Sequence, residues 1–474
     1  MATIYLPLLR FFALIFLGIF ESSVFAAGFS LYGEGNGSAV GNFAAGIAAE
    51  YNDASVGWYN PAGLAFLHKS QAVLGGVGVI PYVNLAGNAR FTTVLPQLPD
   101  SPPFYYSQNF HNLKGADHAG IPSFHFAYPL GPNTTAGISV VSPYGLATSW
   151  DAESALRYAA TYTKLITIDI APEIGGRLTD FLTGGIGLDL EEATVTFNQV
   201  LGAPAILNEF GDNVVPSTLD STSSNVGDSF SVGFHAGLLL HLWQNHSRIG
   251  VNYQSAIQHR FYGNSTLKGR LADPNLNVFD PLVSNPNTVF ANETLQSNGI
   301  SLPSVTTLSI YQDITPRLAL LGSVVYTGWG TIQDINLLNV AALTVDDTGQ
   351  AIQANVNIIN QDNFHDVWRF ALGANIIVND KFLMRLGGGF DETPTILAER
   401  DVRLPDANRY ALAIGGHYQL NRAFGVDFGY SRIFMNEIII NKLQILDATN
   451  QIQTIATGKA HANLLGAQAV WTLD

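Results

Sequence analysis

The chain has 474 residues, of which only 12% are charged, while 11% are aromatic and 46 residues are glycine. Soluble proteins have about 25% charged residues, so this chain lacks the charge needed to cover several soluble domains. Its formal net charge is -15 and it has no basic cluster. This argues against nucleic acid as a partner, because phosphate binding requires concentrated lysine and arginine. The absence of cysteine excludes disulfides, thiolate metal sites and cysteine nucleophiles.

Residues 1–26 have the pattern of a secretory signal peptide. Arg10 supplies a positive charge, Phe11–Phe20 forms an apolar core, and small residues precede a cleavage site after Ala26. The alternative is a transmembrane helix, which needs about 20 apolar residues. The apolar run between Arg10 and Glu21 is shorter than that. We therefore predict that the mature chain begins after Ala26.

Residues 27–68 show no alternation of polar and apolar side chains. The stretch is rich in glycine and other small residues, and Asn60-Pro61-Ala62-Gly63 has the composition of a turn. We predict that it folds as an N-terminal hatch, or plug, inside a barrel that residues 69–474 build around it.

The rest of the chain alternates with period two. In 230–241, Phe230, Val232 and Phe234 alternate with Ser231 and Gly233, and similar segments occur at 121–130, 164–171 and 424–432. Successive side chains of a strand point to opposite faces, so each segment has one apolar face. A soluble β-sandwich would give the same alternation. Strands of about 9–11 residues with aromatic ends, the signal peptide and the low charge favour a transmembrane barrel instead.

Fourteen segments qualify as strands, an even number as bacterial barrels prefer: 70–82, 121–130, 134–148, 161–173, 176–195, 230–243, 247–262, 303–314, 317–329, 365–378, 381–391, 409–419, 422–434 and 461–473. We therefore predict an all-β membrane protein, a 14-stranded antiparallel transmembrane β-barrel. Short turns should lie on the periplasmic side. The long connectors should face outward: 83–120, 196–229, 263–302, 330–364, 392–408 and 435–460. Two of them mix apolar and polar residues, which is compatible with capping loops or with an apolar surface groove.

Several motifs occur in a characteristic order along the mature chain: the run from Asn42 to Ser55, Asn60-Pro61-Ala62-Gly63, Ser142-Pro143-Tyr144-Gly145, Thr327-Gly328-Trp329, Asp366-Val367-Trp368, Gly389-Phe390-Asp391, Arg403-Leu404-Pro405-Asp406 and Gly429-Tyr430-Ser431. Because these motifs occur in this order, the chain resembles the outer-membrane long-chain fatty acid and hydrocarbon transporters of the FadL/TodX type.

This resemblance implies a barrel closed by a hatch, with ligands captured between outer loops and released sideways. The ligand pocket would lie beside the N-terminus, here Ala27, Gly28 and Phe29. The exit would be a gap at an inward kink of the third strand, here at Ser142, Pro143 and Gly145, because proline removes a ladder hydrogen bond and glycine permits a bend. In the hatch, Asn60, Pro61 and Ala62 would face that kinked wall.

The sequence departs from the family pattern at the pocket. Fatty-acid members hold the carboxylate with basic side chains, and the matching positions are near Thr194 and Asn336, with Glu191 and Glu192 nearby. A carboxylate ligand would lose charge-assisted hydrogen bonds there. Either another base takes the role, for which the candidates are Arg157, Lys164 and Arg177, or the ligand is neutral.

Catalysis has no support in the sequence, because the histidines are scattered and no Gly-x-Ser-x-Gly elbow occurs. We expect no enzyme activity, no cofactor and no metal. The predicted function is passive uptake of hydrophobic molecules, above all long-chain fatty acids, across the bacterial outer membrane. The alternatives are a channel for neutral or aromatic hydrocarbons and a surface adhesin. The expected partners are the hydrophobic ligand, outer-membrane lipid and lipopolysaccharide, and the protein is expected to be a monomer.

Overall fold

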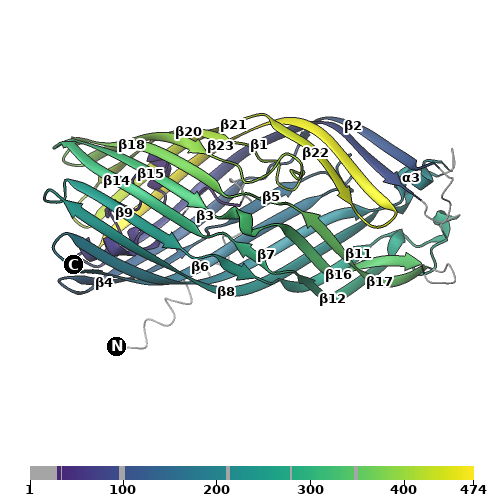
Figure 1. Ribbon diagram of the computed structural model, residues 1–474, viewed down its shortest axis with the longest axis horizontal. Coiled ribbons are helices and arrows are strands. Elements are labelled where there is room, and N and C mark those ends of the chain that lie inside the picture. The colour runs from purple at the N-terminus through teal and green to yellow at the C-terminus, as the bar shows by residue number, and fades with distance from the viewer. Residues whose placement is uncertain are drawn as a thin grey trace.

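A computed structural model describes residues 29–33, 35–94, 102–209, 214–277, 280–345 and 351–473. The strands lie side by side at a slant and form one long barrel (Figure 1). Among the described residues, no helix is long and apolar enough to cross a membrane.

In the described part of the chain, fourteen strands close the barrel, as predicted, and the third of them consists of two pieces, β4 and β5. Every neighbouring pair is antiparallel, and the last strand pairs with the first from Gln71↔Thr472 to Thr93↔Asn450, which closes the sheet into a barrel. In order around the barrel the strands are β1 (Gln71–Thr93), β3 (Ala119–Gly131), β4 (Thr134–Val141) with β5 (Gly145–Ser149), β6 (Tyr162–Arg177), β7 (Leu182–Leu201), β8 (Ser221–Leu242), β9 (Ser247–Gln254), β14 (Val305–Thr315), β15 (Leu318–Thr327), β18 (Val367–Asn379), β19 (Phe382–Asp391), β20 (Arg409–Gln419), β21 (Phe424–Met435) and β23 (Asn450–Thr472).

Alternation places the apolar side chains on the outside of this barrel. Phe230 and Leu372 are 65% and 73% exposed, whereas inward-facing Ser309 and Ser323 are 0% and 4% exposed. This is the reverse of a soluble sandwich, whose apolar faces are turned inward. The outer surface therefore suits lipid, and closure of the sheet satisfies the backbone groups that lipid cannot.

Most of the predicted outward connectors are not irregular loops. Strands extend through them and pair with each other beyond one end of the barrel, where β2, β22, β16 and β17 lie (Figure 1). The sequence analysis placed these strands in connectors although some of them alternate, as in β17, where Val356 and Ile358 are partly buried and Asn355 and Asn357 are exposed. The additional elements are β2 (Phe104–Lys114), β10 (Ile257–His259), β11 (Tyr262–Lys268), β12 (Val289–Ser297), β13 (Ile300–Leu302), β16 (Asp334–Val345), β17 (Ala351–Gln361), β22 (Ile438–Ile445), α3 (Pro204–Leu207), η3 (Pro216–Leu219), η4 (Arg270–Ala272), η5 (Pro281–Val283) and η6 (Trp329–Thr331).

The described part of the hatch lies inside the barrel, at the end opposite the hairpin extensions (Figure 1). It contains only short helices, namely η1 (Ala39–Asn42), α2 (Val56–Tyr59) and η2 (Pro61–Phe66). Close packing against the wall explains its small residues. A Cβ on Gly41 would lie 2.8 Å from the backbone of Gly415, and one on Gly37 would lie 2.4 Å from the carbonyl of Ala467. The exact boundaries of the predicted signal peptide and hatch remain predictions.

The third strand is interrupted where the sequence predicted a kink. Val141 at the end of β4 pairs with Asp169, and Gly145 at the start of β5 pairs with Ile166. Three residues of the third strand therefore lie opposite two residues of β6, which is a bulge of one extra residue. After this bulge the inward-facing positions change from odd to even numbers, and Leu146 instead of Gly145 is buried.

On its other side, the third strand separates from β3. The β3–β4 pairing ends at Phe124↔Val140, and the first residues of β3, Ala119–Ser123, pair only with β1. Beyond this point a single bridge, Ala116↔Thr148, joins the two sides. The barrel wall thus lacks backbone pairing next to the bulge.

Candidate functional site

An enclosed cavity lies in the barrel above the hatch, next to the bulge. Its volume is about 40 Å³, and most of its walls are apolar. The lining residues come from the N-terminus, the third strand, β6, β7 and four outer segments: Phe29, Leu146, Thr163, Lys164, Leu165, Val195, Phe197, Phe261, Ile300, Leu302, Ile335, Asn360, Asp362, Phe364, Asp401, Arg403 and Leu404. Ligand pockets for small molecules typically measure about 300–1,000 Å³, so the cavity is much smaller than a typical ligand pocket.

Arg403 is a basic side chain in this cavity, held by the outer segment 392–408. Its guanidinium donates to the hydroxyl of Thr163 (2.9 Å), the carbonyl of Ala159 (2.9 Å) and the side-chain oxygen of Gln199 (2.9 Å). These partners are neutral, and none of the ion pairs found within the described ranges includes Arg403. The guanidinium is thus oriented by neutral groups.

Two carboxylates, Asp362 and Asp401, line the same cavity. Burial and the negative charge of Asp401 raise the pKa of Asp362 well above its usual range, against the opposing effect of Lys442. Burial also lowers the pKa of Arg403, although Asp401 and Asp362 act in the opposite direction. Asp362 in its protonated form would offer a hydrogen-bond donor beside Arg403, so the polar corner of the cavity suits a ligand with a carboxylate or another acceptor.

Phe29 closes the cavity from the side of the N-terminus. Its ring packs edge-on against Trp329 with the centroids 5.4 Å apart, and against Phe364 at 6.0 Å. Its carbonyl accepts a hydrogen bond from the backbone N–H of Gly145 (2.7 Å). The N-terminal segment therefore connects the cavity directly to the bulge. The other two predicted N-terminal residues, Ala27 and Gly28, lie outside the described residues.

Thr194 and Asn336 do not line the cavity; their neighbours Val195 and Ile335 do. The Thr194 hydroxyl donates to Asp228 (2.7 Å), and the Asn336 amide donates to Asp334 (3.0 Å). Because strand side chains alternate, an error of one position in matching turns a residue to the opposite face.

The three alternative bases have different environments. Lys164 is among the lining residues of the cavity. Arg157 forms an ion pair with Asp220 (2.7 Å), and Arg177 is the last residue of β6, beside the hatch end of the barrel. The base that the sequence reasoning missed is Arg403, although it stands in one of the motifs that carry the family resemblance.

The Asn60-Pro61-Ala62 turn is buried against a different part of the wall from the one expected. The Asn60 amide donates to the carbonyls of Ala48 (2.7 Å) and Leu238 (3.1 Å), and a Cβ on Gly175 would lie 2.0 Å from the carbonyl of Pro61. The turn therefore packs on β6, β7 and β8. The bulge residues Ser142 and Pro143 lie instead beside Gly145, which the carbonyl of Phe29 contacts.

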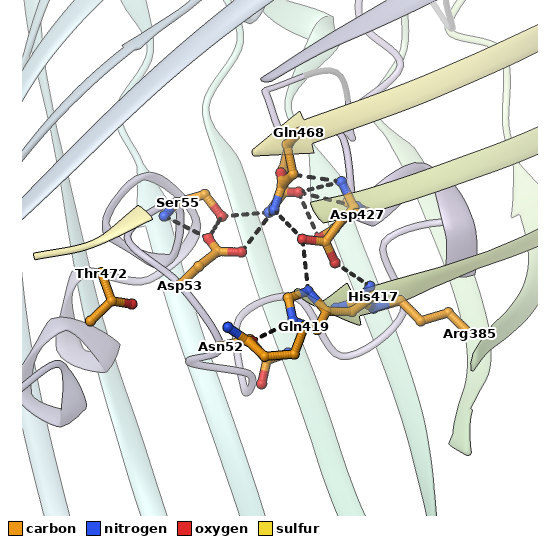
Figure 2. Close-up of polar contacts among 12 residues, drawn as sticks. Asn52, Asp53, Ser55, Arg385, His417, Gln419, Asp427, Gln468 and Thr472 are labelled. Atoms are coloured by element: carbon orange, nitrogen blue, oxygen red, sulfur yellow. Dashed lines mark hydrogen bonds and ion pairs between the residues drawn. The ribbon is translucent and has the colours of Figure 1, made fainter. Parts of the chain in front are cut away.

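A polar network fastens the hatch to the opposite wall of the barrel (Figure 2). The amide of Gln468 on β23 donates to Asp53 of the hatch (2.8 Å) and to Asp427 on β21 (3.2 Å). Asp427 also pairs with Arg385 (2.6 Å) and with His417 (3.1 Å). The described residues contain no group of histidines and carboxylates that fits a metal ion.

Comparisons of this chain with known proteins agree with the barrel geometry. Residues 18–472 match the family model described as outer membrane protein transport protein (OMPP1/FadL/TodX). The chain belongs to this family. The resemblance found in the sequence is thus confirmed, as are the outer-membrane location and the assignment to transport proteins and not to enzymes.

Relatives of this OMPP1/FadL/TodX member span nearly its whole length. It is 26% identical over 428 residues to a long-chain fatty acid transport protein of Escherichia coli O6:H1, covering 88% of each chain. It is 23% identical over 463 residues to outer membrane protein P1 of Haemophilus influenzae, covering 93% of this chain and 94% of that one.

Solved structures support the same fold for this family member. A FadL homologue from Pseudomonas aeruginosa superposes with a TM-score of 0.76 at 22% identity, covering 94% of this chain and 100% of that one. The toluene transporter TodX from Pseudomonas putida superposes with a TM-score of 0.62 at 15% identity, covering 95% and 100%.

Proposed function

We propose that the protein is a passive channel for the uptake of hydrophobic molecules across the outer membrane, and that long-chain fatty acids are its main substrates. The observation that carries this proposal is the apolar cavity with Arg403 at its polar corner. Apolar walls suit an acyl chain, and a guanidinium forms charge-assisted hydrogen bonds with a carboxylate. The relative from Escherichia coli, which bears the name of a long-chain fatty acid transport protein, supports the same substrate class.

The proposed route begins between the outer hairpins, passes through the cavity and leaves sideways beside the bulge of the third strand. The unpaired backbone between β3 and the third strand supports an exit at this place. A hydrophobic ligand that leaves there enters lipid directly and avoids water. The small cavity implies that Phe29 and its neighbours move when a ligand binds.

Uptake of labelled oleate by a deletion strain, with and without the gene, tests the proposal. We expect the gene to restore oleate uptake. Restoration of toluene or alkane uptake without oleate uptake would reject fatty acids as the main substrates, and restoration of neither would favour an adhesin.

Neutral hydrocarbons are the second candidate substrates. The two acids beside Arg403 favour them, because Asp362 and Asp401 offset the positive charge of the cavity. Competition between oleate and toluene for the purified protein distinguishes the two candidates: tighter binding of toluene would support the second.

A further inference from the structure

A second, larger hollow lies on the outer surface of the barrel, across the ends of β4, β6, β7, β8 and β9 that are nearest the hatch (Figure 1). Its volume is about 690 Å³, which is within the range of about 300–1,000 Å³ that is typical of ligand pockets. Among the described residues, it shares no lining residue with the cavity beside Phe29. We call it the outer groove; Gly176, Gly184 and Ala236 form its floor.

The floor of the outer groove faces the membrane. Gly176 stands opposite Gly184 in the β6–β7 pairing, and Ala236 stands opposite Ile186 in the β7–β8 pairing. Residues two positions apart on a strand share one face. Ile174 and Ile186, which lie two positions from the two glycines, are both exposed on the outside of the barrel. The outer groove is therefore open to lipid and separate from the lumen.

Packing within the protein explains the inward-facing glycines of this wall but not the outward-facing pair. On the inner face, a Cβ on Gly185 would lie 2.4 Å from the carbonyl carbon of Pro61 in the hatch. On the outer face, a Cβ on Gly176 would come no closer than 3.4 Å to its neighbours, and one on Gly184 would meet the flexible end of Leu178 at 2.9 Å. Glycine weakens a strand and often marks a place where a ligand approaches closely. The outward pair leaves room for a group that comes from the membrane.

Arg177 gives the outer groove a positive charge at the end of β6. Its side chain is exposed, and none of the ion pairs found in the described ranges includes it. Asp180 in the adjoining turn is also exposed and is absent from the same ion pairs. The exposed side chains of Ile174 and Leu238 are apolar and line the groove as well. The groove thus combines apolar walls with a cation at one end.

We propose that the outer groove binds a membrane glycerophospholipid, with one acyl chain over Gly176 and Gly184 and with the phosphate at Arg177. The acyl chain suits the apolar walls and the space above the glycines. A guanidinium forms charge-assisted hydrogen bonds with a phosphate, which neither the chain nor the glycerol could offer. The lipid comes from the leaflet on the hatch side of the membrane, where β6 ends. This site lies outside the transport route and does not depend on which molecule is transported.

The bound lipid would support the thinnest part of the wall. Gly175 and Gly176 follow each other on β6, and Gly184 and Gly185 follow each other on β7, so both faces of the wall lack side chains at these positions. The hatch fills the inner side, where a Cβ on Gly175 would lie 2.0 Å from the Pro61 carbonyl. An acyl chain supplies the missing contacts on the outer side. We therefore expect the lipid to stabilise the folded protein, since a ligand that binds only the folded state raises the Tm.

The test counts the lipids that remain on the purified protein in native mass spectrometry after dioleoylphosphatidylglycerol is added. Gly184→Leu fills the groove from the membrane side, and Arg177→Gln removes its charge. Gly322→Leu is the control for the first variant, because Gly322 faces the membrane beside Ile310 on another part of the barrel. Arg317→Gln is the control for the second, because Arg317 is exposed in the β14–β15 turn. Diolein, which has the same chains without the phosphate, and oleate are the comparison ligands.

We expect wild-type protein to retain one molecule of dioleoylphosphatidylglycerol that Gly184→Leu does not retain, and this lipid to raise the Tm of wild type only. Arg177→Gln should bind the phospholipid about tenfold more weakly, since it loses a hydrogen bond to a charged group. Its binding of diolein should equal that of wild type. Both control variants should behave as wild type with every ligand.

Equal retention of the phospholipid by wild type and Gly184→Leu would overturn the lipid site, and so would an equal loss in Gly322→Leu. Displacement of the phospholipid by an equal concentration of oleate would identify a free fatty acid as the occupant and would also overturn the proposal. Heat-modifiable migration in gels checks that each barrel has assembled. If Gly184→Leu does not assemble, Arg177→Gln decides: an equal affinity of this variant and wild type for the phospholipid would reject the site.

Discussion

Arg403 is oriented by three neutral partners in a cavity with apolar walls. Its charge decides how the cavity treats a carboxylate and a neutral molecule of the same length. Phe29 decides how much room the cavity has, because its ring packs on Trp329 and Phe364 at one side. Each of these two residues allows a separate test.

Replacing Arg403 by leucine should weaken oleate binding about tenfold to a hundredfold, since a hydrogen bond to a charged group contributes about 1.5–3 kcal/mol. Methyl oleate should bind the variant as well as it binds wild type. Arg403→Lys keeps the charge and should retain most of the oleate affinity. Titration calorimetry of the purified proteins measures both ligands.

Arg422→Leu is the matched control, because Arg422 is exposed in the turn between β20 and β21. An equal loss for oleate and methyl oleate in Arg403→Leu would indicate a collapsed loop and would contradict the role of the charge.

Replacing Phe29 by alanine should tighten oleate binding by about tenfold. The ligand would no longer have to displace a ring from two aromatic contacts, each of which contributes about 0.5–1.5 kcal/mol. Fluorescence competition in detergent measures this affinity. Phe434→Ala, which removes a ring from the lipid-facing surface, should leave it unchanged. Unchanged or weaker binding in Phe29→Ala would argue against Phe29 as the closing residue.

At the scale of elements, the third strand has its bulge next to a stretch where it does not pair with β3. Three residues of this strand oppose two residues of β6, and the inward positions shift by one at the bulge. The bulge keeps β5 apart from β3 and directs Tyr144 into the lumen, where its hydroxyl donates to the carbonyl of Pro303 (2.9 Å).

Deleting Pro143 should therefore restore an unbroken register between the third strand and β6. We expect the straightened strand to pair with Ala119–Ser123 of β3, closing the wall and reducing uptake of labelled oleate to the level of the deletion strain. Pro143→Ala keeps the number of residues and should transport normally. The exit beside the bulge would be refuted by full uptake in the deletion variant when its barrel has assembled.

At the scale of the whole molecule, the hatch and the barrel are one packed unit. Gln468 joins Asp53 of the hatch to Asp427 of the wall (Figure 2). Tight contacts of hatch backbone with wall glycines, such as Gly415 and Gly175, fix the remaining sides. This arrangement supports the proposal that the hatch stays in place and that ligands leave sideways.

Replacing Gln468 by leucine should loosen the hatch, because two buried carboxylates lose a donor and each unsatisfied group costs about 1–3 kcal/mol. We expect a lower Tm and greater sensitivity of cells to a bulky polar antibiotic that the outer membrane normally excludes. Gln453→Leu, on the same strand in the outer hairpin, is the control. An unchanged Tm with no added sensitivity would contradict the fastening role.

The amino-acid sequence by itself determined the architecture of the membrane-spanning part. Period-two alternation, low charge and the order of the family motifs led to a barrel with fourteen strands, and the Pro143 and Gly145 pattern located the interruption of the third strand. These features are local, since alternation depends only on the direction of successive side chains. The outer hairpins were expected to be connectors, although β17 alternates Val356 and Ile358 with Asn355 and Asn357.

Only the tertiary structure decided the chemistry of the lumen. Thr194 and Val195 are neighbours in the chain, but the pairing register turns only Val195 toward the cavity. Arg403 and Phe29 are far apart in sequence, and only the fold brings both of them to the lining of one cavity. The register also places Asp169 of β6 opposite Glu191 of β7. A shift of one residue reverses which face a strand presents, and this information is absent from any single segment of the chain.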